Sequence, residues 1–476
     1  MSKFTEYLSM LVKRSGESIS SISRNSGVER TSIHKALTGE RTLPYNAARK
    51  LANYLALSPQ EQRIYMEYHS MQLQGEDVFE SRTKVMHLLS LLSSLNLRQE
   101  ENLIPWPIEK QDLPPVEEKE FCSGEFAVRS MIRKSVEREL SEPRPQIRVV
   151  APTVQGYFYN FLHTIYERYS CSPEICHIIP VELSVNGQNK TSGMKVLENA
   201  LPLSLDARGS YQPWFYYNRS DYYADPMPFF LLTSTQLICL DRYFENGMVT
   251  TDQAIYRFYY NYFQNMLQYC SILLKYESNY QLMQEYQAEI QGGSTFYELT
   301  PMPLLLLYYS EEQLTGQIER IRSEKDMGYY QGMLEMSRRM LGHYHCFFTK
   351  NGLETFARTG YSEEMPKEEQ TPFLPEERKR ILAEFAKDIR EDRISGRLIN
   401  EFRLVIPRYL KIFISRNRMD LFPMPANRDR SAHTIQLPGS HVSGMIVDFA
   451  EYLPKSEYIL GKDETLEFLE QLIASL

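Results

Sequence analysis

The chain has 476 residues, with 42% hydrophobic and 12% aromatic residues, and a formal net charge of −8. This length exceeds one compact core and predicts about three domains, while the hydrophobic content excludes a fully disordered chain. The acidic balance excludes a protein that coats nucleic acid along its whole length. The charge is uneven, because residues 1–70 carry a net of +4 and the remainder −12. A basic head on an acidic body is typical of a local phosphate-binding surface.

Cysteine usage and hydropathy indicate the compartment. The six cysteines are scattered along the chain and give no disulfide framework, so we expect reduced thiols. The first residues lack the apolar segment of a signal peptide. The longest apolar run, 301–309, is about nine residues and far short of the ~20 that span a bilayer. We therefore expect a cytoplasmic protein with no membrane association.

Residues 1–73 read as a series of short amphipathic helices. Ser18 is a good N-cap for a helix that carries Ile19 and Ile22 on its apolar face. Asn25-Ser26-Gly27 breaks this helix, since Gly27 can take the positive φ of a tight turn. Residues 29–32 open the next helix, which Gly39 ends. Ser58-Pro59-Gln60-Glu61 begins a further helix as a cap, a proline and an acidic third position.

The two helices around Gly27 form a pattern of their own. Ile22, Val28 and Ile33 must be buried between them, so the helices cross steeply. The second helix then projects outward the side chains of Arg30, Thr31, His34 and Lys35. This is how a recognition helix meets a DNA major groove. Two alternatives remain: Arg30, Lys35 and Arg41 are ordinary solvated charges, or the whole motif is a degenerate helix-turn-helix used for protein contact.

The stretch 18–44, SISSISRNSGVERTSIHKALTGERTLP, resembles the XRE family, the Cro and phage-repressor-like helix-turn-helix proteins. The resemblance covers about residues 4–70 and implies a five-helix domain that binds operator DNA, usually as a dimer. It implies that bases are read by Arg30, Thr31 and Lys35. It further implies that phosphate is contacted by Ser18, Arg41 and Thr42, and that Ser32 contacts phosphate or a base. His34 lies on the same exposed face and is either a DNA contact or a surface residue.

The chain departs from the family pattern at three positions. Ile19 stands where Gln is frequent, and Ser23 stands where Ala is usual. Glu29 begins the recognition helix, and its carboxylate repels phosphate unless it accepts from a cytosine amino group or caps the helix. These departures leave the fold intact but leave the base preference open.

The overall prediction is a multidomain chain with an all-α helix-turn-helix domain followed by a larger α/β (α+β) body of two modules. The predicted divisions are 1–73 for the DNA-binding domain, 74–120 for a connecting helix and a proline-rich acidic linker, 121–292 for a sensor or dimerisation module, and 293–476 for a second module.

Within the body the hydrophobic periods predict alternating elements. Helices are expected over 77–97, 125–140, 157–169, 251–290, 310–341, 375–392, 443–453 and 463–475. Strands are expected over 147–151, 177–183, 229–233, 237–240, 304–308, 344–349, 402–407 and 409–415, and two or three strands in all over 214–241.

No catalytic motif stands out in the body. The sequence holds no phosphate loop, GxGxxG, HExxH or GxSxG pattern. Residue types that can ligate a metal occur in two groups, Cys171 with Cys176-His177, and His343–Cys346. Neither group has paired CxxC spacing, so we favour ordinary packing roles. We expect no enzyme activity, no metal and no cofactor.

Two aromatic runs are unusual. In 211–223, Trp214, Tyr216, Arg219 and Asp221 either line a small-molecule pocket or belong to a packed edge strand. The run 256–263 is aromatic on all sides of a helix, which predicts burial at a domain or subunit interface.

These features predict a sequence-specific transcriptional regulator that binds double-stranded operator DNA as a homodimer. Its body would mediate dimerisation and sense a small-molecule or protein effector. The alternatives are an effector enzyme, or a protein-interaction adaptor, carrying a regulatory helix-turn-helix head.

Overall fold

The computed structural model describes residues 2–95, 119–153, 156–183, 192–207, 209–219, 226–277, 279–318, 332, 334–363, 370–416, 418–424, 434–439 and 441–476. The chain divides into two compact units, Met1–Val85 and Met86–Leu476. The predicted boundary at 292–293 falls inside the second unit. No helix in these described ranges is both long and apolar enough to cross a membrane.

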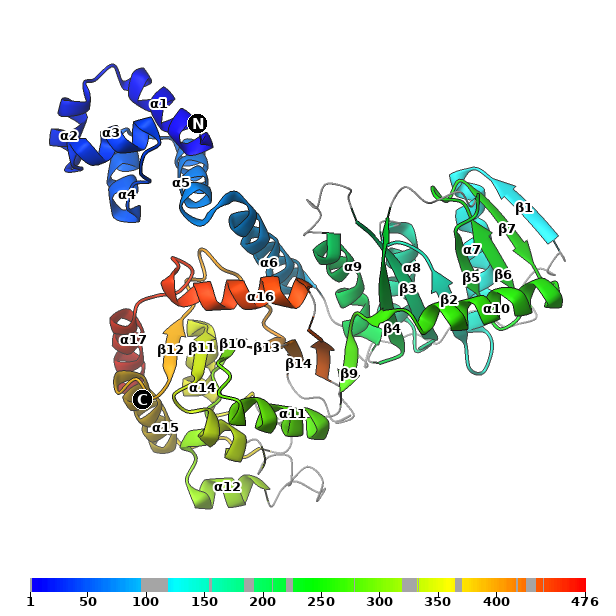
Figure 1. Cartoon of the computed structure of the whole chain (residues 1–476). Coiled ribbons are helices and arrows are strands. Elements are labelled where there is room, and N and C mark those ends of the chain that lie inside the picture. Colours follow the sequence, from blue (N-terminus) through cyan, green and yellow to red (C-terminus); the bar gives the residue numbers. More distant parts are fainter. Residues whose placement is uncertain are drawn as a thin grey trace. The chain divides into compact units, whose positions relative to one another are not determined.

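The described part of the first unit is built of helices (Figure 1). They are α1 (Lys3–Ser15), α2 (Ile19–Ser26), α3 (Arg30–Thr38), α4 (Tyr45–Tyr54), α5 (Pro59–Gln74) and the start of α6 (Glu76–Ser94). Phe4, Leu8, Leu51 and Tyr65 lie fully buried in one apolar cluster that joins α1, α4 and α5. The predicted cap at Ser58 is confirmed, because its hydroxyl accepts from the amide of Glu61 and the Glu61 carboxylate accepts from the amide of Ser58.

The second unit mixes helices with two mixed β-sheets. The first sheet has the order β1-β7-β6-β5-β2-β3-β4-β8. Its strands are β1 (Lys119–Ser123), β2 (Gln146–Val150), β3 (Glu174–Leu183), β4 (Tyr211–Arg219), β5 (Phe229–Leu232), β6 (Leu237–Leu240), β7 (Asn246–Thr250) and β8 (Ser271–Ile272). Strands β2, β3 and β4 are parallel, and the remaining neighbours are antiparallel.

Strand register assigns the helices to the two faces of this sheet. Residues paired across neighbouring strands point to the same face, and one such row consists of Phe121, Met248, Cys239, Phe230, Val150, Ile178, Trp214 and Ile272. This row faces α10 (Gln253–Leu267), whose Phe263 packs on Phe230. The opposite face carries α7 (Glu125–Leu140), α8 (Gly156–Arg168) and α9 (Ser192–Ala207). Figure 1 shows α10 lying across the strands.

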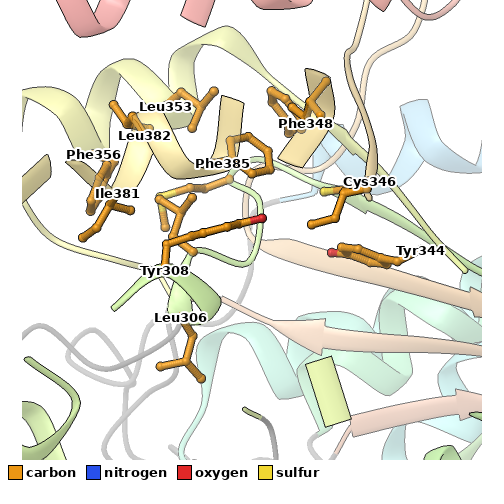
Figure 2. Packing of buried hydrophobic residues seen from close by; sticks show 14 of the residues in the cluster. Leu306, Tyr308, Tyr344, Cys346, Phe348, Leu353, Phe356, Ile381, Leu382 and Phe385 are labelled. Carbon is orange, nitrogen blue, oxygen red and sulfur yellow. The ribbon is translucent and has the colours of Figure 1, made fainter. Parts of the chain in front are cut away.

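The second sheet has the order β12-β11-β10-β13-β14-β15-β9. Its strands are β9 (Lys275–Glu277), β10 (Phe296–Thr300), β11 (Tyr344–Phe348), β12 (Ser395–Leu398), β13 (Leu410–Ser415), β14 (Arg418–Pro423) and β15 (Thr434–Leu437). The helices around it are α11 (Asn279–Gln291), α12 (Glu311–Ile318), α14 (Lys350–Thr359), α15 (Pro375–Arg390), α16 (His441–Tyr452) and α17 (Lys462–Ala474). Figure 2 shows Phe348, Leu353, Phe356 and Phe385 packed together where β11, α14 and α15 meet.

A buried polar cluster joins α11 to β14. Asp420 is fully buried, accepts from the Tyr286 hydroxyl at 2.5 Å and lies 3.0 Å from Nε of Arg418. Arg418 also pairs with Glu285 and lies over the Tyr286 ring, 4.4 Å from its centroid. Burial raises the pKa of Asp420 to about 6, although Arg418 and the Tyr286 hydroxyl act in the opposite direction. The charged form of this carboxyl is therefore costly inside the fold.

Three predicted elements are wrong. The single helix expected over 251–290 is two helices, α10 and α11, because residues 271–277 pair as β8 with β4 and as β9 with β15. The strand expected at 304–308 is a short 3-10 helix, Leu306–Tyr308, and the neighbouring strand is β10 instead. The strand expected at 402–407 is irregular chain. In each case the presence or absence of a strand-pairing partner far away along the chain outweighed the local sequence pattern.

Candidate nucleic-acid interface

The α2–turn–α3 unit is held by three buried side chains and one glycine. Ile22, Val28 and Ile33 are almost completely buried between the two helices. Gly27 ends α2 with φ of 67°, a backbone conformation that costs an L-residue energy but not glycine. The Ser23 hydroxyl donates to the carbonyl of Val28 at 2.7 Å and fixes the chain just after the turn. The relative placement of α2 and α3 is thus determined within about fifteen residues.

The four predicted outward residues of α3 share one exposed face. Arg30, Thr31, His34 and Lys35 are all exposed, whereas Ile33 and Ala36 on the other face are buried. Their spacing of three and four residues places them as neighbours along the helix. The sequence prediction that these side chains point away from the core is confirmed.

Ser18 is the N-cap of α2, as predicted. Its hydroxyl accepts from the amide of Ser21 at 3.2 Å, and the residue is exposed. The amides at this helix end carry partial positive charge that suits a phosphate.

Glu17, which the sequence did not single out, lies next to this cap. Its carboxylate accepts from the Ser21 hydroxyl at 2.5 Å and from the Tyr54 hydroxyl at 2.8 Å. These two hydrogen bonds, first that from Ser21 and then that from Tyr54, lower the pKa of Glu17. A negative charge therefore stands beside the predicted phosphate contact. No sequence signal reveals it, because Tyr54 is 37 residues away along the chain.

Glu29 and Ser32 interact at the start of α3. Glu29 occupies the N-cap position, but its side chain makes no capping hydrogen bond. Instead its carboxylate accepts from the Ser32 hydroxyl at 3.4 Å. The capping role considered for Glu29 is therefore wrong. Because the Ser32 hydroxyl donates to Glu29, this hydrogen bond must break before the same hydroxyl can donate to phosphate.

The loop after α3 is anchored on both sides of Arg41 and Thr42. The amide of Arg41 donates to the carbonyl of Lys35 at 3.3 Å, and Leu43 is buried with its carbonyl 2.7 Å from Nε2 of His69. The Arg41 side chain is exposed and that of Thr42 is half-buried. The loop thus presents a cation from a fixed backbone.

The structure does not bring the predicted ligand-binding residues into a described pocket. Trp214 and Tyr216 lie on β4 facing α10, and both are half-buried in the cluster packed against that helix. Arg219 is the last residue of β4, at its carboxyl end. Asp221 lies outside the described residues. The ligand role of these four positions stays a prediction.

The histidines of the considered metal groups have other partners. His177 is fully buried, with Nδ1 2.9 Å from the Tyr211 hydroxyl and Nε2 2.8 Å from the Ala151 carbonyl, so both ring nitrogens are engaged. Burial lowers the pKa of His177 to about 4. His345 stacks on Tyr297 with ring centroids 4.9 Å apart. Among the residues that the structure describes, no cluster of His, Cys, Asp and Glu could hold a metal ion.

Comparisons with known proteins do not assign this chain to a family. No protein-family model matches this chain, and no curated protein matches it. Among solved structures, the chain is similar to TrmBL2, an archaeal chromatin protein reported to show a novel mode of DNA binding. The identity is 13%, over 51% of this chain and 81% of that chain, with a TM-score of 0.21. A likeness this weak carries no argument about the fold or function of the present chain.

Proposed function

We propose that this protein is a cytoplasmic, sequence-specific transcriptional regulator that binds double-stranded DNA through α3. Arg30, Thr31 and Lys35 would read base edges in the major groove, with His34 beside them. Ser18, Arg41 and Thr42 would contact the phosphate backbone, and Ser32 would contact phosphate or a base. Regulation rather than catalysis is the role that we assign to the chain.

One observation carries this proposal. A short helix is fixed against α2 by Ile22, Val28 and Ile33, and its opposite face is exposed and bears two cations, Arg30 and Lys35. A helix offered in this way fits the width of the major groove, where arginine and lysine pair with guanine O6 and N7. The resemblance of residues 18–44 to the XRE family supports the same assignment.

We further propose that the second unit brings two such helices together and senses an effector. In sheets with parallel strands, ligands bind outside the carboxyl ends of the strands. The carboxyl ends of β2, β3 and β4 lie at one edge because these strands are parallel. Arg219 ends β4 at this edge, so it is the residue at which we would look first for effector binding.

The test is selection of bound fragments from a random DNA pool with the full chain, followed by affinity measurements on the selected sequence. The variant Arg30→Ala/Lys35→Ala should lose discrimination between the selected and a scrambled sequence by ~1–3 kcal/mol for each base-reading side chain. The matched control is Lys13→Ala/Arg63→Ala, which removes the same charge from exposed positions of α1 and α5.

Four outcomes are possible. Relaxed preference in the α3 variant and retained preference in the control support the proposal. Equal losses in both variants would mean that only charge matters, and retained preference in the α3 variant would refute the residue assignment. A wild-type chain that enriches no sequence would favour the adaptor alternative.

A further inference from the structure

The most unusual exposed surface of the second unit is the outer side of α10. Phe258, Tyr262 and Tyr269 are 67%, 48% and 85% exposed, which is high for side chains of this size. They share one stripe with three smaller exposed residues, Ala254, Asn261 and Asn265. On a helix of 3.6 residues per turn, the five positions within α10 fall within about 100° of one another, and Tyr269 follows two residues after the helix ends. We call all six residues the α10 stripe.

The inner side of α10 already has its partner. Phe263 is buried against Phe230, Tyr259 packs on Phe230 at 5.0 Å between centroids, and the Tyr256 hydroxyl donates to the carbonyl of Thr233 at 2.8 Å. Packing on the sheet therefore explains the inner aromatics, and the Tyr262 ring also lies near Phe230, with centroids 6.1 Å apart. It does not account for the exposed rings of Phe258 and Tyr269. The sequence predicts burial of this helix at a domain or subunit interface, and within the chain only its inner side is buried, against the sheet.

The charge distribution favours a second copy of this chain as the partner. Residues 71–476 carry a net charge of −12, so two such bodies repel each other across most surfaces. Residues 253–270 carry one charged side chain, Arg257, which flanks the α10 stripe rather than lying in it. An uncharged aromatic surface is one where two identical acidic bodies can meet without like-charge repulsion.

The order of side chains along the α10 stripe is self-complementary. In an antiparallel helix pair with its two-fold axis between Asn261 and Tyr262, Phe258 faces Asn265 of the other copy, and Asn261 faces Tyr262. In the same arrangement Ala254 faces Tyr269, which follows the helix with its amide bonded to the carbonyl of Met266 at 2.9 Å. Each large ring therefore meets a small or short polar residue, and each contact occurs twice, as the two-fold symmetry of an isologous interface requires.

We propose that the α10 stripe is a homodimer interface in which two α10 helices pair antiparallel about this axis. The proposal rests on the dimeric DNA binding proposed above, in which two α3 helices act together, but the oligomeric state can be tested without DNA. A helix of 15 residues is about 22 Å long. A single helix pair of this length buries less than the ~800 Å² per partner of standard interfaces. We therefore expect dissociation constants of order micromolar for the free protein.

Sedimentation equilibrium of the full chain, from about 1 to 100 μM, measures this association. The average mass of the wild-type protein should rise from that of the monomer toward that of the dimer over this range. Phe258→Asp should weaken association at least ~10-fold, because a buried charge would gain no partner. The control Tyr243→Asp introduces the same charge at a 68% exposed ring outside α10 and should leave association unchanged. Equal far-UV circular dichroism spectra of both variants would establish that folding is retained.

A second pair of variants tests the antiparallel arrangement itself. Phe258→Lys/Asn265→Asp places opposite charges face to face across the axis, whereas Phe258→Lys/Asn265→Lys places like charges there. The first should associate at least ~10-fold more tightly than the second. Equal association of the two double variants would overturn the antiparallel arrangement.

The remaining outcomes separate this inference from the proposed function. A wild-type chain that stays single at the highest concentration, or a Phe258→Asp chain that associates normally, overturns the inference and makes the stripe a surface for a different partner. The Arg30→Ala/Lys35→Ala chain should still associate. A chain that dimerises through α10 but enriches no DNA sequence would refute the DNA-binding proposal alone.

Discussion

The Tyr54 hydroxyl lies 2.8 and 2.9 Å from the two carboxylate oxygens of Glu17, and this contact ties the end of α4 to the residue before the N-cap of α2. The same hydroxyl accepts from the side-chain amide of Asn25, Nδ2, at 3.1 Å. The contact therefore fixes both ends of α2 relative to α4. It also holds a negative charge at the helix end where a phosphate would bind.

Removing this charge should strengthen DNA binding. Glu17→Gln keeps the side-chain size and removes the repulsion beside Ser18, so we expect a gain of ~0.3–1 kcal/mol that shrinks as salt rises. Titration of labelled DNA at two salt concentrations measures the gain. Tyr54→Phe, which keeps the charge but loses its hydroxyl partner, serves as control and should not strengthen binding. Unchanged affinity in Glu17→Gln would place the α2 terminus away from the phosphate backbone.

Arg41→Ala should weaken binding to all DNA sequences alike. The side chain extends from an anchored loop and would neutralise one phosphate without reading a base, so the slope of log K against log salt should fall by about 1. Affinity for the selected and the scrambled sequence should drop by the same factor. A larger loss for the selected sequence would instead make Arg41 a base-reading residue.

Gly27→Ala should destabilise the first unit. The φ of 67° disfavours any residue with a Cβ atom, and no neighbour lies within 4 Å of the Cβ position, so the cost comes from the backbone alone. We expect a loss of ~1–2 kcal/mol. Gly27→Asn should lose less, because asparagine tolerates this conformation. Urea unfolding followed by hydrogen exchange of the α2 and α3 amides measures both, and equal losses would contradict a backbone cause.

Asp420 should make the second unit less stable as the pH rises from about 4 to about 6. The folded protein keeps the proton up to a pKa of about 6, whereas the unfolded chain releases it near the ordinary value of 3.8, so folding becomes less favourable across this window. The difference corresponds to about 3 kcal/mol at most.

Asp420→Asn should remove most of this pH dependence. Urea unfolding at pH 4.5 and pH 7.5 gives the change in the free energy of unfolding for each protein. Glu354→Gln, at an exposed position of α14, is the matched control and should keep the wild-type dependence. An Asn variant that loses as much stability as the wild type between the two pH values would refute the role of Asp420.

The sequence alone determined the features whose causes lie within a few residues. The cap at Ser18, the turn at Gly27 and the capping box at Ser58 were all predicted, because each depends on hydrogen bonds or backbone angles inside one turn of chain. Amphipathic spacing likewise predicted α7 and α15 closely, since one buried face is visible in the sequence period.

The tertiary structure decided everything that depends on a distant partner. Strand pairing divided the expected helix over 251–290 into α10 and α11. Burial against α10 placed Trp214 in a packed layer, and the Tyr54 contact made Glu17 part of the candidate interface. The exposure of Phe258 beside the burial of Phe263 also appears only in the fold, because aromatic residues occur on both sides of this helix and do not mark which side faces outward. Local rules fix turns and caps, whereas the choice of which apolar face is covered belongs to residues far away along the chain.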